Sequence, residues 1–137
     1  MKMKKKMFLT GLVLAFVAAS VMAYVNVKKP KVMLRTSDGT YVVNTEKIGK
    51  SIKGYAGHTP VKVYIKNDKI VKVEAMPNEE TAGIFSGVRQ RLLGKWNGMN
   101  VEKAVNTEVD GISGATYSSK AVKGNVKCAL KYYLDNK

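Results

Sequence analysis

Residues 60–75 read PVKVYIKNDKIVKVEA, and this stretch decides the fold class. Apolar and polar residues alternate along 61–65 and again along 71–75, which is the period of a strand with one buried face. Asn67-Asp68, between the two runs, favours a tight turn. We therefore expect a β-hairpin packed on a core. The residues expected on its core face are Val61, Val63, Ile65, Val71, Val73 and Ala75.

Shorter β-prone runs precede this hairpin, and patterns with helical spacing follow it. The order of strands first and helices afterwards indicates an α+β fold, an antiparallel sheet with packed helices. A polar loop at 76–83 and a glycine-containing break at 94–98 separate these elements. The expected additional strands are 32–35, 41–43 and 47–56. The expected helices are 84–93, 101–105 and 118–134, with Phe85, Val88 and Leu92 on the apolar face of the first.

The N-terminus has the pattern of an export signal or a membrane anchor. Four lysines lie within the first six residues, and residues 7–27 then contain no charge. Either Val21-Met22-Ala23 is a cleavage site for a signal peptide, or the segment remains as an uncleaved anchor helix. Both alternatives place the rest of the chain outside the cytoplasm. We expect three parts: a signal peptide or anchor (1–27), a linker with the first strands (28–48) and the main domain (49–137).

Charge and composition exclude several classes of function. The chain carries 24 basic and 10 acidic residues, for a formal net charge of +14. The lysines are scattered and no nucleic-acid motif occurs, so the charge indicates a preference for acidic partners rather than nucleic acid. Cys128 and His58 are the only residues of their types, which excludes an internal disulfide, a CxxCH haem site and a multi-histidine metal site.

The segment 110–119 reads DGISGATYSS and comes immediately before the last helical pattern. A turn of small residues that opens a helix suits a phosphate, because the first N–H groups of a helix have no partner within it. The alternative is a simple helix cap, in which Thr116 or Ser118 is the N-cap and Gly111 and Gly114 form the turn.

The same string resembles the flavinylation motif of FMN-binding domains, Asp-Gly-x-Ser/Thr-Gly-Ala-Thr. In that family the last Thr carries FMN through a phosphoester, and here that residue is Thr116. Two further segments are similar to the family's in the same order. GYAG at 54–57 precedes the hairpin, and NEETAG at 78–83 is similar to a Glu-Thr-Pro-Gly loop, with Ala82 in place of proline. The resemblance runs from about Gly49 to the C-terminus.

The resemblance implies a small stand-alone member of a family that includes FMN subunits of Rnf and sodium-pumping NADH:quinone reductase complexes. A separate flavin transferase would attach FMN to Thr116. The recognition motif would be Asp110, Gly111, Ser113, Gly114 and Ala115. Glu80 and Thr81 would line the flavin site, and Gly83 would allow close approach of the backbone to the ring.

The resemblance further implies an exported electron carrier or redox subunit, rather than a stand-alone enzyme, that exchanges electrons with membrane-bound redox proteins. An FMN-dependent reductase ranks behind this, because no acid–base group adjoins the motif. A different class also stays open, a non-redox exported module that binds an anionic polymer or lipid through its basic surface.

Overall fold

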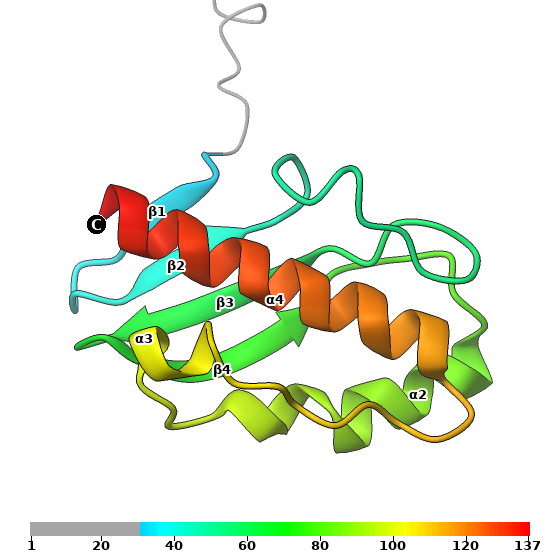
Figure 1. Ribbon diagram of the computed structural model, residues 1–137. Helices are drawn as coiled ribbons and strands as arrows, with labels where there is room; N and C mark the ends of the chain where they lie inside the picture. The colour runs from blue at the N-terminus through cyan, green and yellow to red at the C-terminus, as the bar shows by residue number, and fades with distance from the viewer. Residues whose placement is uncertain (1–30) are drawn as a thin grey trace, which may run out of the picture. The chain divides into compact units, whose positions relative to one another are not determined.

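The computed structural model describes residues 31–137, which form a four-stranded antiparallel sheet with helices packed against it (Figure 1). The strands cross the sheet in chain order: β1 (Met33–Arg35), β2 (Tyr41–Asn44), β3 (Val61–Lys66) and β4 (Lys69–Ala75). The helices follow them in the chain: α2 (Ala82–Arg91), the 3-10 helix η1 (Leu93–Trp96), α3 (Val101–Ala104) and α4 (Thr116–Asn136).

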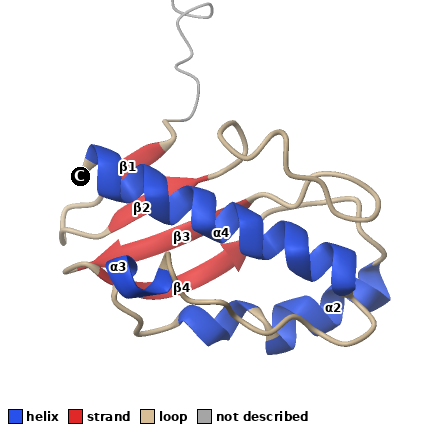
Figure 2. Ribbon diagram, in the orientation of Figure 1, coloured by secondary structure: helices blue, strands red, loops and turns tan. Residues whose placement is uncertain are grey.

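The expected α+β class is therefore confirmed for this part of the chain. Figure 2 shows α4 lying across the sheet and α2 lying beyond the β4 side. The expected export signal or anchor falls at 1–27, outside the described residues. Within residues 31–137, none of the helices combines the length and apolarity needed to cross a bilayer.

The core lies between α4 and the inner face of the sheet. Val61, Val63 and Ile65 alternate on β3 as expected and are fully buried. Val126 and Leu130 of α4 are also buried, and α4 contacts both β2 and β3. Each such side chain contributes about 1.5–3 kcal/mol by leaving water. The same apolar spacing that predicts a helix over 118–134 thus holds α4 across the sheet.

The C-terminal end of α4 is attached to the turn of the hairpin. Asn67 and Asp68 form this turn with φ of 53° and 59°, the left-handed values that a two-residue hairpin turn needs. The Tyr133 hydroxyl donates a hydrogen bond to the Asp68 carboxylate at 2.5 Å, and the Lys137 ammonium lies 3.0 Å from the same oxygen. These two contacts lower the pKa of Asp68. They fix the direction in which α4 crosses the sheet.

The expected core face of β4 is wrong at one position. Val63 pairs with Val73, but Ile65 pairs with Ile70 instead of Val71, so the register shifts by one residue. This irregularity puts Ile70 into the core at 1% exposure and leaves Val71 outside at 50%. An extra residue in one strand reverses the facing of the side chains beyond it, which simple alternation does not anticipate.

Alanine substitutions on β4 test this register directly. We expect Ile70→Ala to lower the free energy of unfolding by about 2–5 kcal/mol, because it leaves a cavity in the core. Val71→Ala is expected to cost less than about 1 kcal/mol, because its side chain is half exposed. Urea unfolding of both variants measures the difference. A larger loss for Val71→Ala than for Ile70→Ala would show that regular alternation continues along β4.

The expected strand at 47–56 is also wrong, because this segment consists of turns and bends with a single isolated bridge, between Lys53 and His58. Contacts with helix α4 determine its path instead of a strand ladder. A Cβ at Gly49 would lie 2.1 Å from Oδ1 of Asn125, and Ile52 packs beside Gly124 of the same helix. The segment therefore requires glycine at position 49, where it approaches α4 most closely.

The helix boundaries differ slightly from those expected. Helix α2 begins at Ala82 rather than at 84 and ends at Arg91, after which η1 occupies part of the expected break. Helix α3 lies where the second expected helix, 101–105, predicts it. Helix α4 begins at Thr116, two residues before the expected start, so that Thr116 is its first helical residue.

Candidate functional site

The first residue of α4 presents a free hydroxyl to solvent. Ala115 occupies the N-cap position, and no side chain caps the helix. Thr116 is exposed, and its hydroxyl has no hydrogen-bond partner within residues 31–137. The alternative in which Thr116 or Ser118 caps this helix is therefore wrong. The N–H groups of the first turn remain available to an anionic group, which the helix dipole also favours.

The turn before Thr116 is held by contacts from outside it. The backbone N–H of Ile112 donates to Oγ of Ser119 at 3.0 Å, and Nζ of Lys95 donates to the Asp110 carbonyl at 3.0 Å. Ile112 is buried, and Gly114 adopts φ of +82°, a conformation that strains residues with side chains. The small residues of the motif therefore build a fixed turn that leaves the Thr116 hydroxyl accessible.

The Glu80 carboxylate lies behind this turn and is 7% exposed. Its Oε1 accepts hydrogen bonds from the Tyr55 backbone N–H and from the Ser118 hydroxyl, both at 2.8 Å. Its Oε2 accepts from the Ala56 N–H at 2.5 Å. A buried charge is tolerated when it is hydrogen-bonded in this way. Glu80 thereby joins the loop at 54–57 to the first turn of α4.

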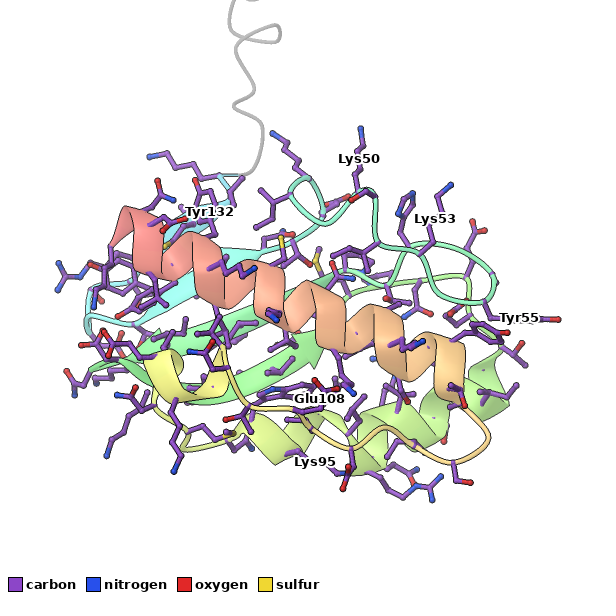
Figure 3. The ribbon with its side chains drawn as sticks, in the orientation of Figure 1. Lys50, Lys53, Tyr55, Lys95, Glu108 and Tyr132 are labelled. Carbon is purple, nitrogen blue, oxygen red and sulfur yellow. The ribbon has the colours of Figure 1, made fainter. Side chains whose placement is uncertain are left out.

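Glycine at position 54 is required for this arrangement. A Cβ on Gly54 would lie 1.9 Å from Oε1 of Glu80, closer than atoms approach. The Gly54 N–H also donates to the Gly57 carbonyl at 2.6 Å, which closes the loop on itself. The GYAG segment thus forms a tight loop that presents Tyr55 outward, as Figure 3 shows at the end of the molecule where α4 begins.

A cavity of about 400 Å³ opens between this loop, α2 and the start of α4. Its volume falls within the range of roughly 300–1,000 Å³ that is usual for small-molecule sites. The Tyr55 and Tyr117 rings lie beside each other, with centroids 6.2 Å apart and planes tilted by 42°. The lining residues are Tyr55, Thr81, Ile84, Gly114, Ala115, Thr116, Tyr117 and Ser118.

The cavity wall contains three large side chains that are unusually exposed. Tyr55 is 76% exposed, Tyr117 67% and Ile84 44%. Apolar and aromatic surface left in water at one place commonly marks a ligand or partner site. Sequence reasoning left these three residues out of the site, although Tyr117 directly follows the expected attachment residue and Tyr55 belongs to the GYAG segment.

The structure brings together only part of the expected site. Thr81, Gly114, Ala115 and Thr116 line the cavity. Glu80 is outside the lining and supports the wall from behind. Gly83 lies in the first turn of α2, also outside the lining, with open space around its Cα. Asp110, Gly111 and Ser113 lie in the turn that leads to Thr116.

The other polar groups offer fewer possibilities for catalysis or for binding a cofactor. A second cavity of about 620 Å³ is lined by the 54–57 loop and by charged residues of both signs, among them Lys50, Lys53, Glu46 and Glu79. Within residues 31–137, no three His, Cys, Asp or Glu side chains are grouped closely enough to hold a metal ion.

Burial raises the pKa of the half-buried Cys128 thiol, which donates to the Ile48 carbonyl at 3.4 Å. Burial therefore favours the thiol over the thiolate, which is the form that reacts.

Trp96 and His58 both lie outside the lining of the cavity beside Thr116. Trp96 is 3% exposed and belongs to the core, at a distance from the cavity lining. His58 lies exposed in the loop before β3, where it forms an isolated bridge with Lys53. Neither contributes to the candidate site.

The fold and the cavity define a small α+β domain with an exposed cavity at the N-terminus of α4. The family model of the FMN-binding domain matches residues 54–131, more than half of the chain. The chain therefore belongs to the FMN-binding domain family. The match includes every residue that lines the cavity. Comparisons with curated proteins and with solved structures give no match.

Proposed function

We propose that this chain carries FMN covalently on Thr116 and acts as an electron-transfer protein on the outer side of a membrane. One observation carries this proposal. The Thr116 hydroxyl is exposed and has no hydrogen-bond partner among residues 31–137, and it lies at the start of an uncapped helix in the wall of a cavity of about 400 Å³. Bound FMN accepts and releases electrons, and the protein sets its position and exposure.

The start of α4 suits the phosphate of FMN. In the proposed attachment, Oγ1 of Thr116 forms a bond to the FMN phosphorus of FAD as the bond between the two phosphates breaks. AMP leaves, and the hydroxyl proton passes to a separate flavin transferase. The product carries a negative phosphodiester next to the unpaired N–H groups of the first helical turn, which stabilise it. Thr116 is therefore the substrate of the transferase, and this chain does not catalyse the attachment.

The walls of the cavity suit the flavin ring. Tyr55, Tyr117 and Ile84 provide flat or apolar surface beside Thr116, and Glu80 holds the loop that carries Tyr55. An aromatic ring stacks favourably on tyrosine in an offset or tilted arrangement. Because these side chains are exposed, one edge of the flavin would remain accessible to a redox partner.

The sequence pattern of the N-terminal segment supports a location outside the cytoplasm. We propose that residues 7–27 export or anchor the chain, with 28–48 as linker and first strands and 49–137 as the flavin domain. A covalent bond retains the cofactor where a free flavin would diffuse away. The partners would then be the transferase that loads Thr116 and membrane-bound redox proteins.

Flavin fluorescence tests the position of the ring. We expect Tyr55→Leu and Tyr117→Leu to raise the fluorescence of the loaded protein several-fold, because tyrosine in contact with a flavin quenches its emission. Tyr64→Leu is the matched control, since Tyr64 lies on the outer face of the sheet and bonds Glu74. Anaerobic reduction followed by mixing with a quinone measures electron transfer in the same samples. A loaded protein that cannot be reduced and reoxidised would contradict the proposed function.

A further inference from the structure

The solvent side of α4 carries a row of lysines. Lys120, Lys123, Lys127 and Lys131 are spaced by three or four residues, which places them within about 80° of one another around the helix. The first acidic residue of α4 is Asp135, in its last turn. The outer face of this helix is therefore uniformly basic for three turns.

The loop between β2 and β3 extends the same surface. This loop packs on α4 through Ile52, which lies beside Gly124, and through Ile48, whose carbonyl accepts from Cys128. Lys50 and Lys53 are exposed on this loop, and Figure 3 shows them extending outward from it. We define the α4 lysine face as Lys50, Lys53, Lys120, Lys123, Lys127 and Lys131.

Most lysines of the α4 lysine face have no salt bridge to another residue within 31–137. Lys123 lies 2.6 Å from Glu108, and it is the one member of the α4 lysine face with a salt bridge in the described part of the chain. Lysines one helical turn apart repel each other and weaken the helix slightly. The repulsion among these lysines does not favour the helix, whereas their combined long-range field can attract an external acidic partner.

The α4 lysine face adjoins the cavity. Lys120 lies one turn after Thr116, and Lys131 lies about 22 Å from Thr116 along the helix. Tyr55 and Tyr117, which line the cavity, are exposed at the end of α4 where this face begins. A partner bound along the face would thus lie next to the accessible edge of the flavin.

We propose that the α4 lysine face is the docking surface for an acidic redox protein that exchanges electrons with the flavin. This inference rests on the function proposed above. Complementary charge accelerates encounter and orients the two proteins, and its effect decreases with salt. An anionic lipid surface would satisfy the same lysines, but it would cover the end of the flavin site with headgroups that carry no electrons. The position of the face beside the cavity therefore favours a protein.

The test uses a reduced, acidic plant-type [2Fe–2S] ferredoxin as the electron donor. Each reduced ferredoxin gives one electron to the flavin of the loaded protein, and stopped-flow absorbance follows the reaction. We expect Lys127→Glu/Lys131→Glu to lower the second-order rate constant about tenfold at low salt, and the difference to disappear at high salt. These two lysines are more than two turns from Thr116, so loading with FMN is expected to be unchanged and is checked by intact mass.

The matched control is Lys66→Glu/Lys69→Glu, which changes the net charge equally at the tip of the hairpin. We expect this pair to change the rate constant less than about threefold. Equal losses in both variants, or a rate constant that does not depend on salt, would overturn the proposed docking surface. So would wild-type rates in the α4 variant together with a loss of binding to phosphatidylglycerol vesicles, which would assign the lysines to a lipid surface.

A second measurement does not depend on the flavin. Oxidised ferredoxin is titrated into isotopically labelled, flavin-free protein, and the backbone amide shifts are followed by NMR. Salt-sensitive shifts confined to α4 and residues 48–54 support the docking surface even if Thr116 is never modified. Shifts elsewhere, or none at millimolar ferredoxin, contradict it. Failure of the docking surface is thereby separated from failure of the proposed FMN attachment.

Discussion

Replacing Thr116 with alanine is expected to abolish covalent flavin completely. The substitution removes the oxygen to which the phosphate would be attached. The two serine hydroxyls of the first turn are engaged, because Ser118 donates to Glu80 and Ser119 accepts from the Ile112 N–H. In-gel flavin fluorescence after denaturation, with the flavin transferase co-expressed, measures the effect because only covalent flavin survives that treatment.

The fold is expected to be retained in this variant. Thr116 is exposed and makes no side-chain hydrogen bond within residues 31–137, so Thr116→Ala should change stability by less than about 0.5 kcal/mol. Thr116→Ser keeps the hydroxyl and should keep the flavin. Thr81→Ala removes a different threonine from the wall of the same cavity and should also keep it. Covalent flavin in Thr116→Ala would show that another residue carries it.

Replacing Glu80 with alanine is expected to destabilise the domain by about 2–4 kcal/mol. The substitution leaves three buried or half-buried donors without an acceptor: the backbone N–H groups of Tyr55 and Ala56 and the hydroxyl of Ser118. It also releases the loop that carries Tyr55 from the start of α4. Urea unfolding of the flavin-free protein measures the loss.

Two further variants define the role of Glu80. Glu80→Gln keeps one acceptor oxygen but turns an NH₂ group toward a backbone donor, so we expect an intermediate loss of about 1–2 kcal/mol. Glu79→Ala is the matched control, because Glu79 is exposed and should be nearly neutral. Equal stability of the Glu79→Ala and Glu80→Ala variants would contradict the role of Glu80 in holding the cavity wall.

The parts of the fold that depend on local pattern could be predicted from the sequence. The hairpin is specified by alternation and by the Asn67-Asp68 turn, and α4 by its apolar spacing, so both were expected at nearly the observed positions. The register shift at Val71 and the path of residues 47–56 were missed. The path of residues 47–56 depends on contacts distant in sequence, such as Gly49 with Asn125 and Gly54 with Glu80, which no local window contains.

The candidate site also contains residues that a local motif predicts and residues that only the assembled fold brings together. Thr116 was expected because its motif is contiguous in the sequence. The walls formed by Tyr55 and Ile84 were missed because these side chains meet Tyr117 only after the sheet and helices assemble. Glu80 was expected beside the ligand, but the structure places it behind the wall, since its carboxylate is used by backbone donors. Residue type alone does not distinguish these two positions.

Intact-mass spectrometry of the chain exported from cells that contain an active flavin transferase tests the central claim most directly. We predict that the mass increases by one FMN minus water, and that fragmentation places this addition on the peptide that contains Thr116. An unmodified mass, in cells where the transferase modifies a control substrate, would contradict covalent attachment. The exposed hydroxyl at the start of α4 would then be an uncapped helix terminus and not a cofactor site.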